Sequence, residues 1–493
     1  MNSSPSLAGR AILAVALMVG FYILALAIAI GLLYIPYAEM TYAHRVHLKL
    51  AAACIIGALV ILWSVLPRFD KFESPGPQLT REEHPRLFEE LEGVARATQQ
   101  AMPAEVYLVP NVNAWVAQRG GIMGFGSRRV MGLGLPLMRM LTRSQFRAVL
   151  AHEFGHYHGG DTKLGPWIYK TRGAIGRTLQ SLRHLSLLQI PFNAYGKVFL
   201  RITHAISRRQ EFVADELAAR CIGSRPLIHG LRTVHGVGPA FDAYWSNECA
   251  PVLNAGFRPP LTEGFRQFVQ AGKVAEAIGR QVEEELQSGK VDPYDTHPPL
   301  KERIAAIEHL PAGETGLDDP VATTLLADVA TLEQRMVATL AGPEAAGKLK
   351  PIDWTEVCTH VYLPQWTILA QANSSVLSGL KVESLPALAT NMKSFGQRCR
   401  TFAGEAPDDE HAAGLGTAVI GAALALLLIQ RGAQSDASPG VEISATLGQA
   451  RVEPFSILRS IADGKLTTAD WQRQCTELGI SGAGLGNVAP ATA

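Results

Sequence analysis

The segment TRSQFRAVLAHEFGH, residues 142–156, decides how the whole chain is interpreted. A Thr-x-x-Gln capping box at its start and the Ala-Val-Leu run that follows predict a helix. On that helix His152 and His156 are four residues apart, so both imidazoles leave one face and can bind one metal ion. Glu153 projects near that face, where a carboxylate can take a proton from water. This pattern indicates a zinc peptidase, and the alternative is a coincidental surface motif.

A third protein ligand is expected downstream, on a helix predicted over about residues 196–222. No acidic residue lies between Asp161 and Glu211, so Glu211 is the first candidate. Asp215 shares its helix face four residues later, a position that suits a carboxylate holding a ligand histidine by its other N–H. His204 remains a rival ligand one heptad earlier, and a solvated Glu/Asp pair is the other interpretation.

Three long apolar runs suggest contact with a membrane. Residues 11–36 carry no charge, and a helix of that length spans about 39 Å, enough to cross a bilayer with some tilt. Residues 50–66 form a second run, so a membrane hairpin is favoured over a cleaved signal peptide. Residues 412–430 are also uncharged, and either a buried helix or a third span fits them.

The charge pattern bears on orientation. Residues 162–210 contain nine Lys or Arg but no Asp or Glu, which fits either a solvated basic face or a segment lying against an anionic membrane surface. Arg68 and Lys71 follow the hairpin, whereas the loop within it offers Arg45 and Lys49. Together with the basic stretch, this favours a cytoplasmic catalytic region. The six scattered cysteines predict reduced thiols, in agreement with that compartment.

Four motifs follow one another within about residues 80–310: Asn113-Ala114-Trp115, the block Ala148–Asp161, Ser207-Arg208 with Glu211 and Ala214-Asp215, and Thr296-His297-Pro298-Pro299 with Arg303. This set resembles the HtpX and CAAX-prenyl-endopeptidase family of membrane zinc metallopeptidases. Two departures stand out. Trp115 occupies a position where the family commonly has Phe, and residues 162–205 are basic and amphipathic where HtpX-type members have further spans.

The resemblance implies a metal centre and its catalytic groups. His152, His156 and Glu211 would bind one Zn²⁺ per chain. Glu153 would act as the general base, and Asp215 would orient a ligand histidine.

The resemblance also implies the substrate contacts. His297 and Arg303 would reach the site and steady the oxyanion or the substrate backbone. Asn113, Ala114 and Trp115 would lie on an edge strand that pairs with an extended substrate.

These observations predict a mainly α (α+β) fold: a transmembrane hairpin, a zincin-like helical domain with a small edge-strand sheet, and a mostly helical C-terminal region. The expected segments are 1–70 for the anchor, 71–310 for the peptidase domain, 311–350 for a linker or helix, and 351–493 for a region of unknown function.

The function this predicts is a membrane-anchored zinc endopeptidase that acts on proteins or peptides near the lipid bilayer. By analogy with the family it resembles, its role would be membrane-protein quality control. A net charge of +1 gives no case for nucleic-acid binding. A membrane-tethered scaffold or an inactive, chaperone-like homologue with a structural zinc is the alternative.

Overall fold

The computed structural model describes residues 7–66, 71–121, 126–157, 165–288, 297–313 and 318–486. Arg68, Asp161 and Thr296, on which parts of the sequence interpretation rest, lie outside these ranges. The fold is mainly α-helical with small sheets, which confirms the predicted class. The chain divides into two compact units: unit 1 is Met1–Gly238 with Arg280–Leu340, and unit 2 is Pro239–Gly279 with Ala341–Ala493. The four segments expected from the sequence stay a prediction.

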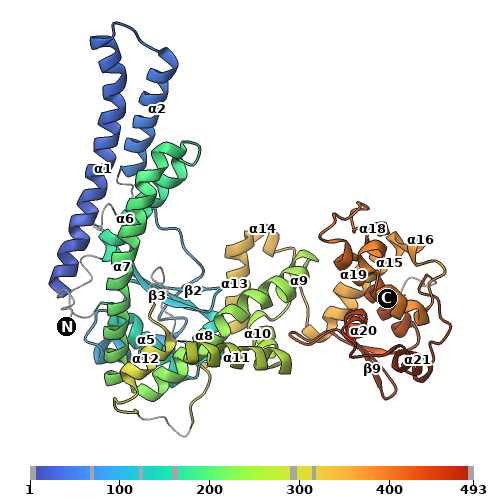
Figure 1. Ribbon diagram of the computed structural model, residues 1–493. Coiled ribbons are helices and arrows are strands. Elements are labelled where there is room, and N and C mark those ends of the chain that lie inside the picture. Colours follow the sequence, from blue (N-terminus) through green and yellow to red (C-terminus); the bar gives the residue numbers. More distant parts are fainter. Residues whose placement is uncertain are drawn as a thin grey trace. The chain divides into compact units, whose positions relative to one another are not determined.

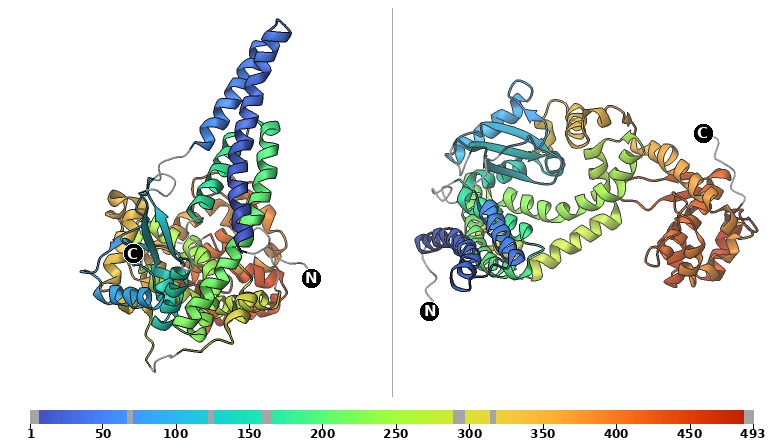
Figure 2. Two further views of the ribbon diagram at one scale, coloured as in Figure 1. Left: turned by 90° about the vertical axis from the view of Figure 1, so that its left-hand side faces the viewer. Right: turned by 90° about the horizontal axis from the view of Figure 1, so that it is seen from above.

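Unit 1 begins with two long apolar helices, α1 (Leu7–Tyr42) and α2 (Leu48–Val65), which lie side by side (Figures 1 and 2). Both meet the length and hydropathy of a membrane span. One stripe of α1 is buried, but its outer face exposes large apolar side chains such as Ile12, Ile23 and Ile30. Water is a poor solvent for so large an apolar surface, whereas lipid is a good one. The protein is therefore a membrane protein, and these two helices are its predicted hairpin.

The basic stretch forms a second helical hairpin, α6 (Gly165–Ser181) and α7 (Ser186–Cys221). Its apolar side packs against α1 and α2 in one buried cluster that includes Phe21, Ile61 and Phe192. Polar contacts join the hairpins as well: the hydroxyls of Ser64 and Thr178 lie 2.8 Å apart. The stretch is therefore not wholly solvated, because its apolar side chains cover the hairpin. Its contact with an anionic membrane surface stays a prediction.

A four-stranded sheet lies beside the helices, in the order β1-β2-β4-β3. The parallel pair β2 (Glu105–Val109) and β4 (Arg128–Gly134) forms its centre, flanked by β1 (Gln78–Leu79) and β3 (Ala114–Arg119). The strand β3 pairs antiparallel with β4 and forms one edge of the sheet. Trp115 of β3 lies across Gly132 of β4, where any larger side chain would collide with the indole. This packing fixes β3 on the sheet while one side of its backbone stays unpaired within the sheet.

The helix α5 (Arg143–Gly155) begins at the predicted capping box, which is confirmed. The Thr142 hydroxyl accepts from the Gln145 backbone N–H, and the Gln145 side chain accepts from the Thr142 backbone N–H. At the other end, Gly155 lets α7 approach closely: a Cβ at this position would lie 2.8 Å from the Cα of Ala214. The remaining helices of this unit include α3 (Pro85–Ala97), α4 (Leu135–Met140) and α12 (Leu300–Ile307).

Unit 2 is built around α19 (Ala412–Gln430), the third apolar run. This helix also has the length and hydropathy of a span. However, the side chains from Val419 to Leu428 are buried in the core of the unit, together with Trp366, Phe395 and Trp471. Of the two interpretations left open by the sequence, the structure favours the buried helix.

Other elements of unit 2 are α9 (Ala250–Asn254), α10 (Leu261–Gln270), α15 (Leu363–Ala372), α18 (Met392–Arg398), α20 (Ile457–Ala462), α21 (Thr468–Glu477), the pair β5 (Phe257–Arg258) and β6 (Lys350–Pro351), and the sheet β7 (Gln434–Asp436), β8 (Ser444–Leu447) and β9 (Ala450–Val452). The strand β5 pairs with β6, and the Trp354 indole N–H donates to the Pro260 carbonyl at 2.9 Å. These contacts explain why residues 239–279 belong with the C-terminal region. The chain passes between the units within three helices, α8 (Ser224–Tyr244), α11 (Gly272–Ser288) and the end of α13 (Val329–Ala341).

Candidate metal centre

The last turn of α5 presents the two histidines of the HExxH motif. Their rings lie with centroids 4.7 Å apart and nearly perpendicular planes, at 81°. His152 is buried, whereas the His156 side chain is 29% exposed. Four-residue spacing on a helix therefore places both imidazoles on one face, as the sequence predicts.

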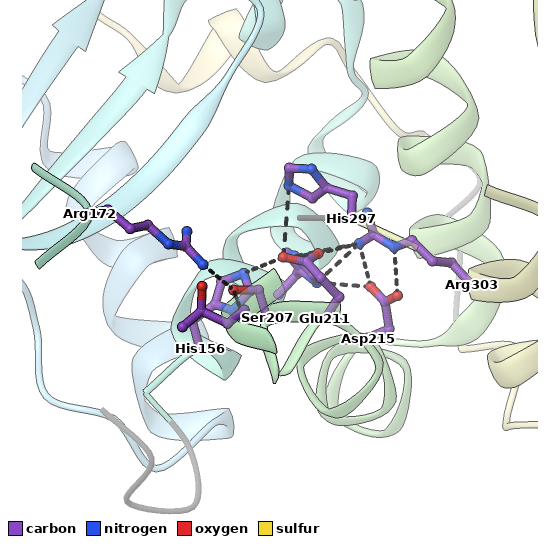
Figure 3. A network of polar contacts seen from close by, with 9 residues as sticks. His156, Arg172, Ser207, Glu211, Asp215, His297 and Arg303 are labelled. Carbon is purple, nitrogen blue, oxygen red and sulfur yellow. Dashed lines mark hydrogen bonds and ion pairs between the residues drawn. The ribbon is translucent and has the colours of Figure 1, made fainter. Parts of the chain in front are cut away.

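Glu211 reaches these histidines from α7. Its two carboxylate oxygens lie 3.4 Å from His152 Nε2 and 3.6 Å from His156 Nε2 (Figure 3). Gly155 makes this possible, because its lack of a side chain brings α7 against the end of α5. His204, the rival ligand, is seven residues earlier on α7, or about 10 Å along the helix axis. The geometry therefore favours Glu211 as the third donor.

The donor set fits a zinc ion. Neighbouring ligands of a tetrahedral zinc lie about 3.4 Å apart when the zinc–ligand bonds are 2.0–2.1 Å long. The distances from Glu211 Oε2 to His152 Nε2 and from Glu211 Oε1 to His156 Nε2, 3.4 and 3.6 Å, are close to this value. Glu211 Oε2 is buried and makes no hydrogen bond within the described part of the chain. The cationic groups of His152 and Arg303 lie 3.4 Å from this oxygen, so it keeps acceptor capacity that a metal ion could use.

Asp215 holds the other nitrogen of His152. Its Oδ1 lies 2.8 Å from His152 Nδ1, which leaves Nε2 directed toward Glu211. Arg303 of α12 in turn binds Asp215 with two contacts, Nε to Oδ2 at 2.8 Å and Nη2 to Oδ1 at 2.7 Å. All three side chains are buried. A ligand histidine held by a fixed carboxylate is the usual arrangement around protein-bound metals.

The predicted substrate contacts Arg303 and His297 occupy different environments. Arg303 is 4% exposed, and it lies 3.4 Å from Glu211 as well as contacting Asp215. The His297 side chain is 56% exposed, and its Nε2 lies 3.8 Å from Glu211 Oε1. Both residues thus reach the centre, one from within the protein and one from its surface. Their roles toward substrate stay predictions.

The titratable groups of this cluster have very different pKa values. Burial disfavours a charged His152, but Asp215 and Glu211 outweigh it and raise the pKa of His152 to about 10. Burial and the positive charge of His152 lower the pKa of His156 to about 4. Burial opposes ionisation of Glu211, but the charged His152 ring and Arg303 hold its pKa at about 2. At neutral pH the metal-free centre therefore has one imidazolium, a neutral imidazole and ionised Glu211.

Glu153 differs from the other carboxylates. Burial raises its pKa to about 7, and a hydrogen bond to its carboxylate from the Val116 backbone partly offsets this effect. Val116 is in β3, so this carboxylate lies beside the edge strand as well as beside the metal donors. A general base works best when its pKa is near the working pH, and Glu153 meets this condition.

The sequence motif Asn113-Ala114-Trp115 lies at the start of this edge strand. Ala114 and Trp115 are the first residues of β3, and Asn113 directly precedes them. The Asn113 carbonyl accepts from the Gly134 N–H at 2.8 Å, which anchors the strand to the end of β4. The proposed pairing of this strand with substrate stays a prediction.

Sequence reasoning missed three features of the centre. The hydrogen bond between Val116 and Glu153 and the approach of Gly155 to Ala214 both depend on long-range packing. The third is Arg172 of α6, whose Nη2 donates to Ser207 Oγ at 3.5 Å beside the metal donors (Figure 3). The lack of acidic residues over 162–210 is a sequence signal for it, since Arg172 has no nearby carboxylate in the sequence.

The fold and the centre define a metallopeptidase-like domain, and comparison with known proteins agrees. Residues 81–311 match the model of Peptidase family M48. A protein named Protease HtpX homolog, from Archaeoglobus fulgidus, is 27% identical over 189 residues, covering 35% of this chain and 54% of that protein. Protease HtpX of Hahella chejuensis is 24% identical over 220 residues, covering 40% of this chain and 65% of that protein. No solved structure matches.

These matches confirm the resemblance to the HtpX-type membrane metallopeptidases of family M48, and they support a membrane protease. The chain spans between about half and two thirds of the length of these two relatives. The matched region contains the helices α5, α7 and α12, which carry every donor of the candidate centre.

Proposed function

We propose that this protein is a membrane-anchored, zinc-dependent endopeptidase. The observation that carries the proposal is the convergence of His152, His156 and Glu211, with Glu153 placed between these donors and the edge strand. A structural zinc takes four protein ligands, whereas three donors and a general base are the composition of a catalytic site. This composition favours the peptidase over a tethered scaffold with a structural zinc.

Zinc, when bound by the three donors, supplies a Lewis acid that polarises the scissile carbonyl and acidifies water. The protein supplies the rest of the reaction. The strand β3 binds the substrate in extended form, so that the scissile bond lies beside Glu153. The Glu153 carboxylate takes a proton from the attacking water and returns it to the leaving amine.

Asp215 and Arg303 act as positioning residues in this proposal. Asp215 fixes the ring of His152, and Arg303 holds Asp215 through two hydrogen bonds. Arg303 is too deeply buried to be the main substrate contact, although the resemblance implies one. The exposed His297 is the better group to steady the oxyanion or the substrate backbone, because its ring lies at the surface beside Glu211.

The substrates in this proposal are proteins or peptides near the bilayer, including damaged membrane proteins. The helices α1 and α2 support this choice, because they belong to the same compact unit as the centre and hold it at the membrane. The role in quality control rests on the resemblance to HtpX proteases alone.

The catalytic region faces the cytoplasm in this proposal, and cysteine labelling tests it. In an otherwise cysteine-free chain, Glu89→Cys places a thiol on an exposed position of α3, and His44→Cys places one in the loop between α1 and α2. A membrane-impermeant thiol reagent should label intact cells carrying His44→Cys but not those carrying Glu89→Cys. The reverse pattern would place the catalytic region outside.

The decisive test of the function combines metal analysis with proteolysis. The purified full-length protein should contain about one zinc per chain and should cleave an unfolded model protein such as casein. Removal of zinc with a chelator should abolish cleavage, and added zinc should restore it. A zinc-loaded protein that binds unfolded substrates but never cleaves them would instead support the chaperone-like alternative.

A further inference from the structure

An arginine from α6 approaches the candidate centre and has no counter-ion among the described residues. Arg172 Nη2 donates to Ser207 Oγ at 3.5 Å, and Ser207 in turn donates to the Thr203 carbonyl at 3.1 Å. In Figure 3 Arg172 reaches toward Ser207 from the side of His156, opposite to Arg303. The guanidinium is thus a separate positive group on the other flank of the metal donors.

The helix α7 relates the contact between Arg172 and Ser207 to the position of Glu211. Ser207 precedes Glu211 by four residues, which is about 6 Å along the helix axis and one turn on the same face. An extended peptide advances about 3.3 Å per residue. The contact of Arg172 on α7 therefore lies one helical turn from Glu211, a span comparable to about two residues of extended peptide.

Arg172 keeps unused hydrogen-bonding capacity. Its Nε is buried and has no hydrogen-bond partner in the described segments. The contact with Ser207, the one found there, is at the outer limit of a hydrogen bond. Two neighbouring arginines of this hairpin have polar partners within the protein itself. Arg177 donates to the Ser64 carbonyl at 3.3 Å, and Arg183 donates to His184 at 2.9 Å. Burying half of a guanidinium without an anion is unfavourable. The position of Arg172 beside the metal donors therefore suits an anion supplied by a bound substrate.

The sequence around this arginine is poor in acidic residues. Residues 162–210, which include α6 and most of α7, contain no Asp or Glu. Among the described residues, Arg172 forms no ion pair, although the buried Arg303 forms two. The planar guanidinium fork matches a carboxylate with two parallel hydrogen bonds.

We propose that Arg172 is a specificity residue that binds a substrate carboxylate within about two residues of the scissile bond. This inference rests on the proposed peptidase function. The carboxylate comes either from an acidic side chain or from the free C-terminus of the substrate. Both have the same chemistry, and the peptide series below distinguishes them.

The test uses the zinc-loaded full-length protein and a neutral parent peptide that it cleaves. One series replaces Gln by Glu at each of the two positions on either side of the scissile bond. A second series ends two residues after that bond, as a free acid or as an amide. One carboxylate should raise kcat/KM about 10- to 100-fold, the usual effect of a charged hydrogen bond. The series in which the gain appears identifies the source of the carboxylate.

Variants assign the preference to Arg172. Arg172→Met should remove the preference while neutral peptides are still cleaved, and Arg172→Lys should retain part of it. Arg183→Met is the matched control, because it removes the same charge from the far end of the hairpin and should keep the preference. If Arg172→Met misfolds, the natural protein still provides a test. It should cleave acidic peptides faster than neutral ones, and this difference should disappear at high salt.

Binding provides a second readout. Fluorescence anisotropy with Glu153→Gln should show tighter binding of the preferred acidic peptide than of its neutral partner, and adding Arg172→Met should remove the difference. Equal cleavage and equal binding of acidic and neutral peptides would overturn the proposal and leave the peptidase function intact. Failure to cleave any peptide would instead refute the peptidase function, and the binding comparison would still decide the role of Arg172.

Discussion

Asp215 and Arg303 form a buried ion pair with two hydrogen bonds, at 2.8 and 2.7 Å, although they are 88 residues apart in the sequence. The same Asp215 oxygen that binds Arg303 Nη2 also contacts His152 Nδ1 at 2.8 Å. Together these contacts fix the orientation of the His152 ring. The ion pair therefore links α12 to the face of α5 that carries the candidate metal donors.

Arg303→Ala should weaken both the fold and the centre. It leaves the buried Asp215 with one partner fewer, and breaking a buried pair costs about 3–5 kcal/mol. Loss of an outer partner of a ligand histidine typically lowers metal affinity about 10- to 100-fold. Thermal unfolding in detergent and a zinc competition assay measure the two effects.

Arg303→Lys should lie between the natural protein and Arg303→Ala, since it keeps the charge but loses the second hydrogen bond. The control Arg220→Ala removes an arginine from an exposed pair with Glu216 on α7 and should change neither property. Unchanged stability and zinc affinity in Arg303→Ala would show that the pair does not support the centre.

Glu211→Ala should sharply lower the amount of zinc that survives dialysis, whereas His204→Ala should not. The physical reason is position: the Glu211 oxygens lie at ligand spacing from both imidazoles, and His204 is two turns away on α7. Elemental analysis per chain measures the effect, with the exposed Glu216→Ala as the charge control. If His204→Ala lost zinc and Glu211→Ala kept it, the third ligand would have to be reassigned.

Gly155→Ala should separate α5 from α7. The added methyl would lie 2.8 Å from the Cα of Ala214, so the backbone must shift, at a cost of about 1–3 kcal/mol. Zinc affinity should fall with the unfolding temperature because Glu211 moves away from the histidines. Gly176→Ala on α6 is the matched control: its Cβ meets nothing within 4 Å, and a helical alanine is slightly stabilising. Equal behaviour of the two variants would contradict the close approach as a requirement for the site.

Zinc uptake by the metal-free protein at pH 8 should release about one proton. His152, with its pKa raised to about 10, is charged at this pH and must lose its Nε2 proton to bind metal. His156 and Glu211, with pKa values of about 4 and 2, are already deprotonated, and so is Glu153 with a pKa of about 7. The apparent zinc affinity should therefore rise with pH until about pH 10.

Calorimetry in buffers of different ionisation enthalpy counts the released protons. Glu153→Gln provides the control, because it removes the other group that titrates near this range. Zero proton release would mean that His152 is neutral in the metal-free protein.

The sequence predicts those parts of the protein that depend on local patterns. The capping box locates the start of α5, the HExxH spacing places two imidazoles on one face, and uncharged runs identify α1 and α2. The pair Glu211 and Asp215 could also be found from spacing, because an acid-free stretch precedes it.

The start of α7 could not be predicted in the same way. The sequence suggests a helix from about residue 196, but α7 begins at Ser186 and contains Pro191. Proline usually ends a helix. Here tertiary packing prevails, because Phe192 next to this proline is buried against the apolar hairpin.

Contacts between distant segments were beyond sequence reasoning. The pairing of Phe257 with Lys350 and the hydrogen bond from Trp354 to Pro260 bring residues 239–279 to the C-terminal region. Neither contact has a local signature. A truncation before residue 350 would therefore break unit 2, so experiments on the peptidase should keep the full chain.

The central claim is that this protein hydrolyses peptide bonds with Glu153 as general base at a zinc centre, and one comparison tests it most directly. Zinc content and cleavage of an unfolded protein are measured side by side for the natural protein and for Glu153→Gln, purified identically. The variant should retain the same zinc per chain, because His152, His156 and Glu211 are intact, while its turnover falls about 10²- to 10⁴-fold. Near-normal turnover by the zinc-loaded variant, with contaminating proteases excluded, would contradict the account.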